Sequence, residues 1–223
     1  MDYELHHEDR DINWFLDTVI VRDIEAVINA GAGYLAFSLV AQAIELLGAL
    51  LDEEEFHEPG LSESRFAKAI DALFEPINVD YLRHNKADSD YYLWKFLRCG
   101  MAHVLRPNSR LVFTGRGDAA RIGYRHLQVV ELAGYEKPQL VLVIEDLHVD
   151  LREACRRAKN LIKRKTHPKL QQGYISVTTF HYAFVNPGDG VRLDWPKGQT
   201  LEVATPSVSG GPIIKVGITG SRY

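Results

Sequence analysis

Arg98 and His103 are the residues of this chain whose types and spacing best suggest chemistry. They lie five positions apart near the end of an amphipathic segment, which Pro107 must soon terminate because proline cannot continue a helix. The guanidinium of arginine is a permanent cation that binds phosphate, and histidine transfers protons near neutral pH. Together they predict a site that acts on a phosphodiester. The structural alternative is a solvated Arg98, with His103 meeting the free carbonyls at the helix end.

Cys99 supports a second chemical hypothesis. Cys99 and His103 are spaced i, i+4 and therefore share one face of a helix. A thiolate–imidazole pair of this kind performs covalent acyl transfer in cysteine-dependent enzymes. The sequence shows no third residue that would orient the pair, and a free cysteine is more often packed in a core.

A basic segment follows in the second half of the chain. Its eight cationic residues are Arg152, Arg156, Arg157, Lys159, Lys163, Arg164, Lys165 and Lys169. A helix face of this kind can follow a phosphate backbone, which makes Arg156, Arg157, Lys163 and Arg164 the predicted substrate-binding residues. The ordinary alternative for such a charge run is a solvated helix surface.

Two groups of residues contain potential metal ligands. They are His6, His7, Glu8 and Asp9 at the start of the chain, and Glu145, Asp146, His148 and Asp150 later. Neither group has a recognisable metal-ligand spacing, so the sequence predicts no metal and no cofactor. Residues 115–118, with two glycines, are predicted to form a turn rather than a phosphate-binding loop, because no Lys-Ser pair follows them.

Hydrophobic periodicity predicts four helices that would position Arg98 and His103. The first spans about residues 11–30 and the second about 32–51. The third begins at Ser62 or Ser64 and ends before Pro76. The fourth runs from about residue 88 or 89 to about residue 105. Four helices with short or moderate connections predict an antiparallel bundle over residues 1–107.

Residues 108–223 are predicted to form a β-rich extension. Strand-like runs occur at 111–115, 126–132 and 139–145, and the last two are separated by a hairpin connection. The basic helix is expected at about residues 150–166. Prolines and glycines then divide the chain into short strands and an extended tail, whose aliphatic residues would need burial on a neighbouring subunit. The predicted fold class is therefore α+β.

Composition limits the possible function classes. The 223 residues carry a formal net charge of −4, which argues against nucleic-acid binding by overall charge, so a local patch would be needed. The two cysteines argue against a disulfide framework, and with the acidic N-terminus they favour a cytoplasmic protein. The apolar run at 32–51 is long enough to cross a membrane, but Gln42 and Glu45 near its middle favour a core helix.

The predicted bundle, with Arg98 and His103 near the end of its last helix, resembles the HEPN superfamily and its Arg-x4-His signature. That family consists of helical bundles, many of which are metal-independent ribonucleases. The resemblance implies that Arg98 would polarise a phosphate and His103 would act as general acid or base while the 2′-hydroxyl of the RNA attacks. The family usually has a polar residue after the arginine, where this chain has Cys99.

The resemblance also implies that two protomers face one another across the site. On an ideal helix Arg98 and His103 would be about 140° apart, so a dimer would bring one residue of each chain together. The expected function is RNA or nucleotide binding, with endoribonuclease activity in a stress or defence system as its catalytic form. The alternative is a non-catalytic module that assembles homo-oligomers.

Overall fold

The structure is a computed structural model that describes residues 11–171, 192–194 and 200–202. Contacts divide the chain into two units, Met1–Ile175 and Ser176–Tyr223. In the second unit, strands β4 (Arg192–Asp194) and β5 (Thr200–Glu202) pair antiparallel. The remainder of the predicted tail lies outside the described residues, as do His6 and His7. The first unit contains helices and a small sheet, so the fold is α+β.

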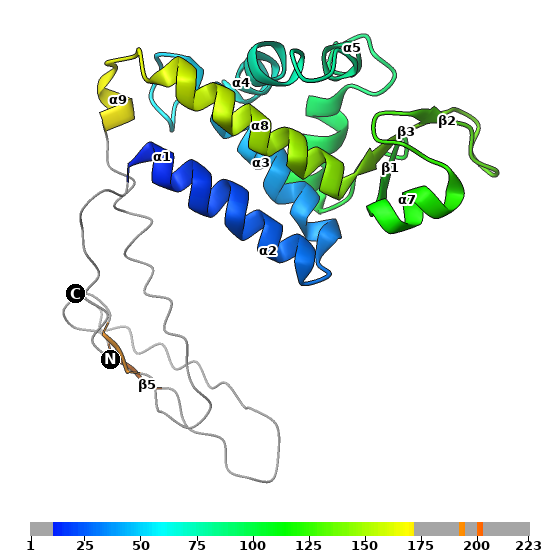
Figure 1. The fold of residues 1–223 in the computed structure, drawn as a ribbon, viewed down its shortest axis with the longest axis horizontal. Coiled ribbons are helices and arrows are strands. Elements are labelled where there is room, and N and C mark those ends of the chain that lie inside the picture. The colour runs from blue at the N-terminus through cyan, green and yellow to red at the C-terminus, as the bar shows by residue number, and fades with distance from the viewer. Residues whose placement is uncertain (1–10, 172–191, 195–199, 203–223) are drawn as a thin grey trace, which may run out of the picture. The chain divides into compact units, whose positions relative to one another are not determined.

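The helices predicted over residues 11–30, 32–51 and 62–74 are present. The first is one rod (Figure 1) made of α1 (Ile12–Phe15), the π-helical η1 (Leu16–Asp23) and α2 (Ile24–Asn29). The second is α3 (Gly33–Leu51) and the third is α4 (Ser62–Ala69) with η2 (Ile70–Phe74). The N-cap of α4 is Leu61, and the hydroxyl of Ser62 instead donates to Glu45.

The fourth helix begins later than predicted. It consists of the π-helical η3 (Trp94–Cys99) and α6 (Gly100–Val104), and a short helix absent from the sequence prediction, α5 (Asp80–His84), precedes it. Ser89 accepts the backbone N–H of Tyr91 in a turn rather than capping a helix. The carboxamide of Asn85 accepts the N–H of Trp94 at 3.0 Å and therefore satisfies a free donor where η3 begins.

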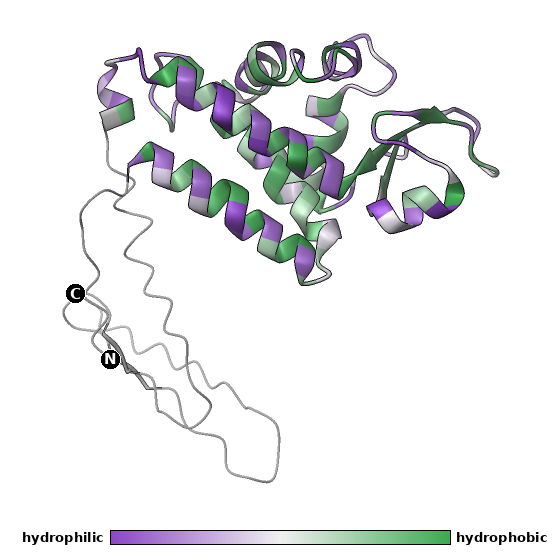
Figure 2. Cartoon of the chain, viewed as in Figure 1, coloured by the Kyte–Doolittle hydropathy of each residue, from purple (hydrophilic) through white to green (hydrophobic). Residues whose placement is uncertain are grey.

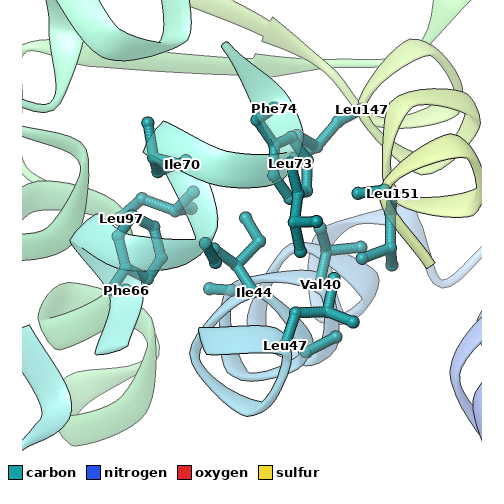
Figure 3. Close-up of a cluster of buried hydrophobic side chains, with 14 of the residues drawn as sticks. Val40, Ile44, Leu47, Phe66, Ile70, Leu73, Phe74, Leu97, Leu147 and Leu151 are labelled. Carbon is teal, nitrogen blue, oxygen red and sulfur yellow. The ribbon is translucent and has the colours of Figure 1, made fainter. Parts of the chain in front are cut away.

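Helix α3 lies at the centre of the hydrophobic core. Val40, Ile44 and Leu47 contact side chains from α4, η2, η3 and α8 (Figure 3). Gly48 permits the close packing of α3 on α4, because a Cβ at this position would lie 1.7 Å from the backbone oxygen of Arg65. The packing of these helices therefore depends on a missing side chain as well as on apolar ones.

A three-stranded sheet lies at one end of the helices (Figure 1). Its strands are β1 (Leu111–Thr114), β2 (Val129–Val130) and β3 (Gln139–Val143), in the order β1-β3-β2. β1 runs parallel to β3, and the antiparallel β2–β3 pair confirms the predicted hairpin. The crossover contains α7 (Arg116–Ile122) where the sequence analysis expected only a turn.

Both faces of β3 are buried, and one of them belongs to the core of the helices. Leu140 and Leu142 join the main hydrophobic cluster, whereas Val141 and Val143 pack with Ala119 in a second, smaller one. This is the alternation that a strand covered on both sides produces. The sheet and the helices thus share a core, and the contacts do not separate them at residue 107.

The basic helix α8 (Ile144–Ile162) starts directly after β3, earlier than the predicted residue 150. Its apolar stripe is clear in Figure 2, and Leu147 and Leu151 from this stripe lie in the core of Figure 3. The apolar run of β3 continues into the helix, so no change in composition marks the boundary. A short helix, α9 (Pro168–Gln171), follows.

Among the described residues, α3 is the one helix long and apolar enough to cross a membrane. Of its apolar window, 61% is buried against the rest of the protein, and Glu45 near its middle forms an ion pair. Both features are those of a core helix, as the sequence analysis expected.

Candidate active site at the end of α6

Arg98 lies in η3 and is held by a carboxylate from α3. Its guanidinium Nε donates to Oε2 of Glu45, and the two side chains are only 19% and 20% exposed. The same Glu45 oxygen accepts the hydroxyl of Ser62 at 2.9 Å, and Ser62 accepts the indole N–H of Trp94 at 3.2 Å. This chain of hydrogen bonds orients Glu45, and Glu45 in turn orients Arg98.

The helix around Arg98 is not a regular α-helix. In the π-helical η3, backbone N–H groups bond to carbonyls five residues back instead of four, which widens the turn. The separation of about 140° between Arg98 and His103 applies to an ideal helix. That angle therefore does not describe this segment. Short π-helical segments are frequent at functional sites, where they displace a side chain from the regular register.

His103 lies in the last turn of α6 and is exposed. Within residues 11–171 its imidazole has no hydrogen bond or ion pair, so the predicted contact with helix-end carbonyls is not formed there. Arg98 and His103 are not bonded to each other. One chain therefore presents a held arginine and a free histidine on the same helix, and does not join them into one site.

The turn that follows His103 is tightly defined. Leu105 has a φ of 49°, and the N–H groups of Leu105 and Arg106 both bond to the carbonyl of Gly100. A Cβ on Gly100 would lie 2.6 Å from the carbonyl oxygen of Arg106, so only glycine allows this return of the chain. The hydroxyl of Tyr34 donates to the carbonyl of Leu105 at 2.7 Å and ties the turn to α3.

Large apolar side chains are exposed on α3 and at the end of α6. They are Tyr34, Leu35 and Leu39 on α3, and Val104 and Leu105 at the end of α6. The hydrogen bond between Tyr34 and Leu105 joins the two parts, and we call these five residues the α3–α6 apolar surface. Clustered exposure of large apolar residues is typical of surfaces that contact another protein.

Cys99 does not have the properties of an activated nucleophile. Burial raises the pKa of its thiol, and this outweighs the opposing effect of the adjacent Arg98. The thiolate is the reactive form, so a raised pKa disfavours covalent catalysis. Cys155 in α8 is more deeply buried, which raises its pKa to about 12. The structure therefore gives no support to the thiolate–imidazole hypothesis.

The four predicted substrate-binding cations differ in their surroundings. Arg156 and Arg157 in α8 both donate to the carboxylate of Glu153, one turn earlier. Lys163 and Arg164 lie just beyond α8, are exposed and form no ion pair within the described part of the chain. Two of the four predicted phosphate-binding cations thus share one neighbouring carboxylate.

Two other lysines of the basic segment are structural. The Lys169 ammonium is fully buried and donates to the carbonyl of Ala49, the carbonyl of Glu54 and the carboxylate of Asp52. Lys165 donates to the carbonyl of Leu51. Both cations therefore satisfy free carbonyls at the C-terminal end of α3, where the helix dipole is negative. The sequence pattern counted them with the surface charges.

The second group of potential metal ligands does not form a site. His148 lies in α8, where it is buried and its Nε2 bonds to the carbonyl of Val21 at 2.9 Å, and Asp150 accepts the hydroxyl of Tyr81. In the described ranges no cluster of three histidine, cysteine or carboxylate side chains could hold a metal ion. All four residues of this group belong to helix α8.

Sequence reasoning missed a buried network of three titratable residues. The hydroxyl of Tyr81 donates to Asp150 at 2.7 Å and lies 2.8 Å from Nε2 of His126, while His126 Nδ1 accepts the N–H of Val143 at 3.0 Å. Because Nδ1 is an acceptor, the proton of the neutral imidazole is on Nε2 and bonds to Tyr81. Burial lowers the pKa of His126 to about 4 and raises those of Tyr81 and Asp150.

This network joins α5, α8 and the segment before β2, which are distant in sequence. No local pattern predicts it, since Tyr81 stands in a segment that reads as a polar connector. Every polar atom that it uses is paired, which is what a structural network requires.

No protein family, curated protein or solved structure matches this chain.

Proposed function

We propose that this protein is a HEPN-like RNA-binding protein that cleaves RNA without a metal, as a homodimer of the cytoplasm in a stress or defence system. The observation that carries the proposal is that Arg98, oriented by Glu45, and the unbonded His103 lie near the end of the same helix. The resemblance of the Arg-x4-His signature supports the substrate class. The α3–α6 apolar surface supports the dimer, because it lies beside His103 and has no partner within residues 11–171.

The chemistry follows from the two side chains. The 2′-hydroxyl of the RNA attacks the adjacent phosphorus, a new O–P bond forms, and the bond from phosphorus to the 5′-oxygen of the next nucleotide breaks. His103 transfers a proton in this exchange, and Arg98 stabilises the charge that develops on the phosphate oxygens. Glu45 binds Arg98 through Nε, so the η nitrogens of the guanidinium are the donors directed at phosphate.

In the proposed dimer, each site combines Arg98 of one chain with His103 of the other. Burial of Leu35, Leu39, Val104 and Leu105 from the α3–α6 apolar surface drives association and carries His103 into the interface, while Tyr34 stays exposed. Lys163 and Arg164 supply exposed positive charge for the remainder of the RNA backbone. Arg156 and Arg157 contribute further positive charge once they leave the carboxylate of Glu153 and bind phosphate instead.

Complementation between inactive chains tests this proposal. Arg98→Ala and His103→Ala should each abolish cleavage of a mixed-sequence RNA in EDTA while leaving the protein folded and dimeric. Mixing the two variants after reversible unfolding should restore about a quarter of the wild-type rate, because half of the dimers are mixed and each has one intact composite site. No restored cleavage, with mixed dimers demonstrated by mass spectrometry, would contradict the shared site. If the wild-type protein neither binds nor cleaves RNA, the proposed function is wrong.

The second candidate is a non-catalytic module that assembles homo-oligomers through the same surface. One observation favours it: Arg98 is already neutralised by Glu45, as a structural ion pair would be. This candidate predicts that Val104→Asp breaks the assembly, whereas His103→Ala has no effect on any activity. Sedimentation of both variants beside an RNA cleavage assay distinguishes the two functions.

A further inference from the structure

A pocket of about 370 Å³ lies between α2, α3, β1 and the start of α8. Its apolar lining includes Ile28, Tyr34, Phe37, Phe113 and Ile144. A volume of this size is in the range of small-molecule sites. Tyr34 connects the pocket with the candidate active site, because its hydroxyl bonds to Leu105, two residues after His103.

The walls of the pocket favour a flat ring. The rings of Phe37 and Phe113 are stacked with centroids 3.9 Å apart, and the ring of Tyr34 is tilted against Phe113 at 5.9 Å. Phe37 is buried, whereas Tyr34 is 48% exposed and offers a free aromatic surface. Unstacked RNA bases bind to proteins by stacking on aromatic side chains of this kind.

Three glycines keep the rest of the lining open. Gly31, Gly33 and Gly115 contribute backbone without side chains, and Gly31 has a φ of +80° that other residues rarely adopt. A Cβ on Gly115 would lie 3.4 Å from Oε1 of Glu145 and would cover the approach to that oxygen. The carboxylate therefore borders an open space.

The charged residues that line the pocket are both acidic. Glu145 uses Oε2 to accept the backbone N–H of Arg116 at 2.7 Å, which fixes the carboxylate, and Asp118 pairs with Arg121. The side chain of Arg116 points to a different carboxylate, that of Asp146. A phosphate is thus repelled from the pocket, whereas a group that presents hydrogen-bond donors is attracted.

We infer that this pocket binds a guanine base, stacked on Tyr34 with its N1–H and N2–H2 donors on the carboxylate of Glu145. Guanine is the RNA base with two adjacent donors on its Watson–Crick edge, and a carboxylate accepts two hydrogen bonds side by side. Adenine and cytosine present one donor beside an acceptor, and uracil presents one donor between two acceptors, so each would place an acceptor against Glu145. This inference rests on the proposed function, for which it supplies a base specificity.

Nucleotide binding to the full chain tests the inference. GMP should bind about tenfold more tightly than AMP, CMP or UMP, as measured by calorimetry, because one good bidentate contact supplies discrimination of this size. Glu145→Gln should remove the preference, since its carboxamide retains an acceptor for Arg116 but replaces the other oxygen with a donor. The matched control is Glu136→Gln, which removes an equal charge from an exposed connection and should leave the preference unchanged. Tyr34→Ala should weaken the binding of all four nucleotides.

The outcomes separate the pocket from the ribonuclease. If the protein cleaves RNA but binds GMP, AMP, CMP and UMP with equal affinity, the guanine site is overturned and the proposed function stands. A GMP preference that depends on Glu145, in a protein that neither binds nor cuts RNA, would support the pocket and overturn the ribonuclease. Agmatine is a small ligand with a guanidinium group. If the pocket binds agmatine but not GMP, the carboxylate of Glu145 accepts a guanidinium and not a base, and the inference is overturned.

Discussion

The carboxylate of Glu45 and the guanidinium of Arg98 form an ion pair between residues 53 positions apart in the chain. Glu45 stands on the helix at the centre of the core, so the pair ties the candidate catalytic arginine to the packed interior of the molecule. The position of the Arg98 guanidinium is thus fixed by Glu45 on α3, although the aliphatic part of the arginine side chain is flexible.

This relationship predicts coupling between the two residues. Glu45→Ala and Arg98→Ala each leave a largely buried charge without its partner, and each should lower the free energy of unfolding by about 1–3 kcal/mol. The double variant removes both charges, so it should be more stable than the sum of the single effects implies. Urea unfolding of the four proteins measures the coupling, and strictly additive losses would contradict it.

Glu45→Gln isolates the positioning of Arg98 from stability. The carboxamide retains an acceptor for Arg98 but loses the charge, so the fold should survive while the guanidinium becomes less firmly oriented. We expect kcat for RNA cleavage to fall by about tenfold with little change in KM, because orientation acts mainly in the transition state. A rise in KM alone would show that Glu45 affects RNA binding instead.

Lys169 should be essential for stability despite its place in a basic segment. Lys169→Met keeps the length of the side chain but leaves Asp52 and the carbonyls of Ala49 and Glu54 without this donor, a loss that we expect to be about 3 kcal/mol. The control is Lys163→Met, which removes the same charge from an exposed position and should change stability by less than about 0.5 kcal/mol. Equal effects of the two variants, measured by urea unfolding, would show that the buried contacts contribute nothing.

The helices with a regular apolar stripe could be predicted from the sequence. The first, second and third helices have apolar residues at helical spacing, and the structure contains all three. α5 and α7 were missed because they are short and carry few buried residues: α7 buries only Ala119, so no periodicity is visible. The start of α8 was placed too late because β3 and the first turn of α8 are both apolar.

The candidate site could be predicted only in part. Arg98 and His103 were identified by type and spacing, but Glu45 was interpreted only as evidence against a membrane span. Its role depends on the packing of α3 against η3, which no local pattern encodes. Burial likewise separates Lys169 from Lys163, although both carry the same charge in the same basic segment.

Gly48 should tolerate no side chain. Its Cβ would overlap the backbone of Arg65, which cannot move away as a flexible side chain can, so Gly48→Ala should destabilise the protein by about 3 kcal/mol or more. Gly117→Ala is the matched control, because a Cβ there meets nothing within 4 Å and alanine favours a helix. We expect this control to be neutral or slightly stabilising. Thermal unfolding of both variants checks the contrast, and a neutral Gly48→Ala would contradict the close packing of α3 on α4.

The buried His126 should make the protein less stable in mild acid. Its pKa is lowered to about 4 in the folded state, mainly by burial, against an ordinary value of 6.5. As the pH falls from about 6.5 to about 4, the unfolded chain gains a proton on this residue that the folded protein does not accept. The folded state therefore loses up to about 3 kcal/mol over this interval. The raised pKa of Asp150 acts in the opposite direction, because the folded state then takes up a proton before the unfolded chain does, so the loss is steepest near the upper end of the interval.

His126→Gln separates this effect from the other titrating groups. Its carboxamide can accept the N–H of Val143 and donate to Tyr81, as the neutral imidazole does, but it does not titrate. Between pH 7 and pH 5, the free energy of unfolding, measured with urea, should fall more for the wild-type protein than for the variant. The exposed His57→Gln, as control, should follow the wild-type pH dependence. Parallel pH profiles for wild type and His126→Gln would show that His126 is protonated in the folded protein and that its burial does not exclude the charge.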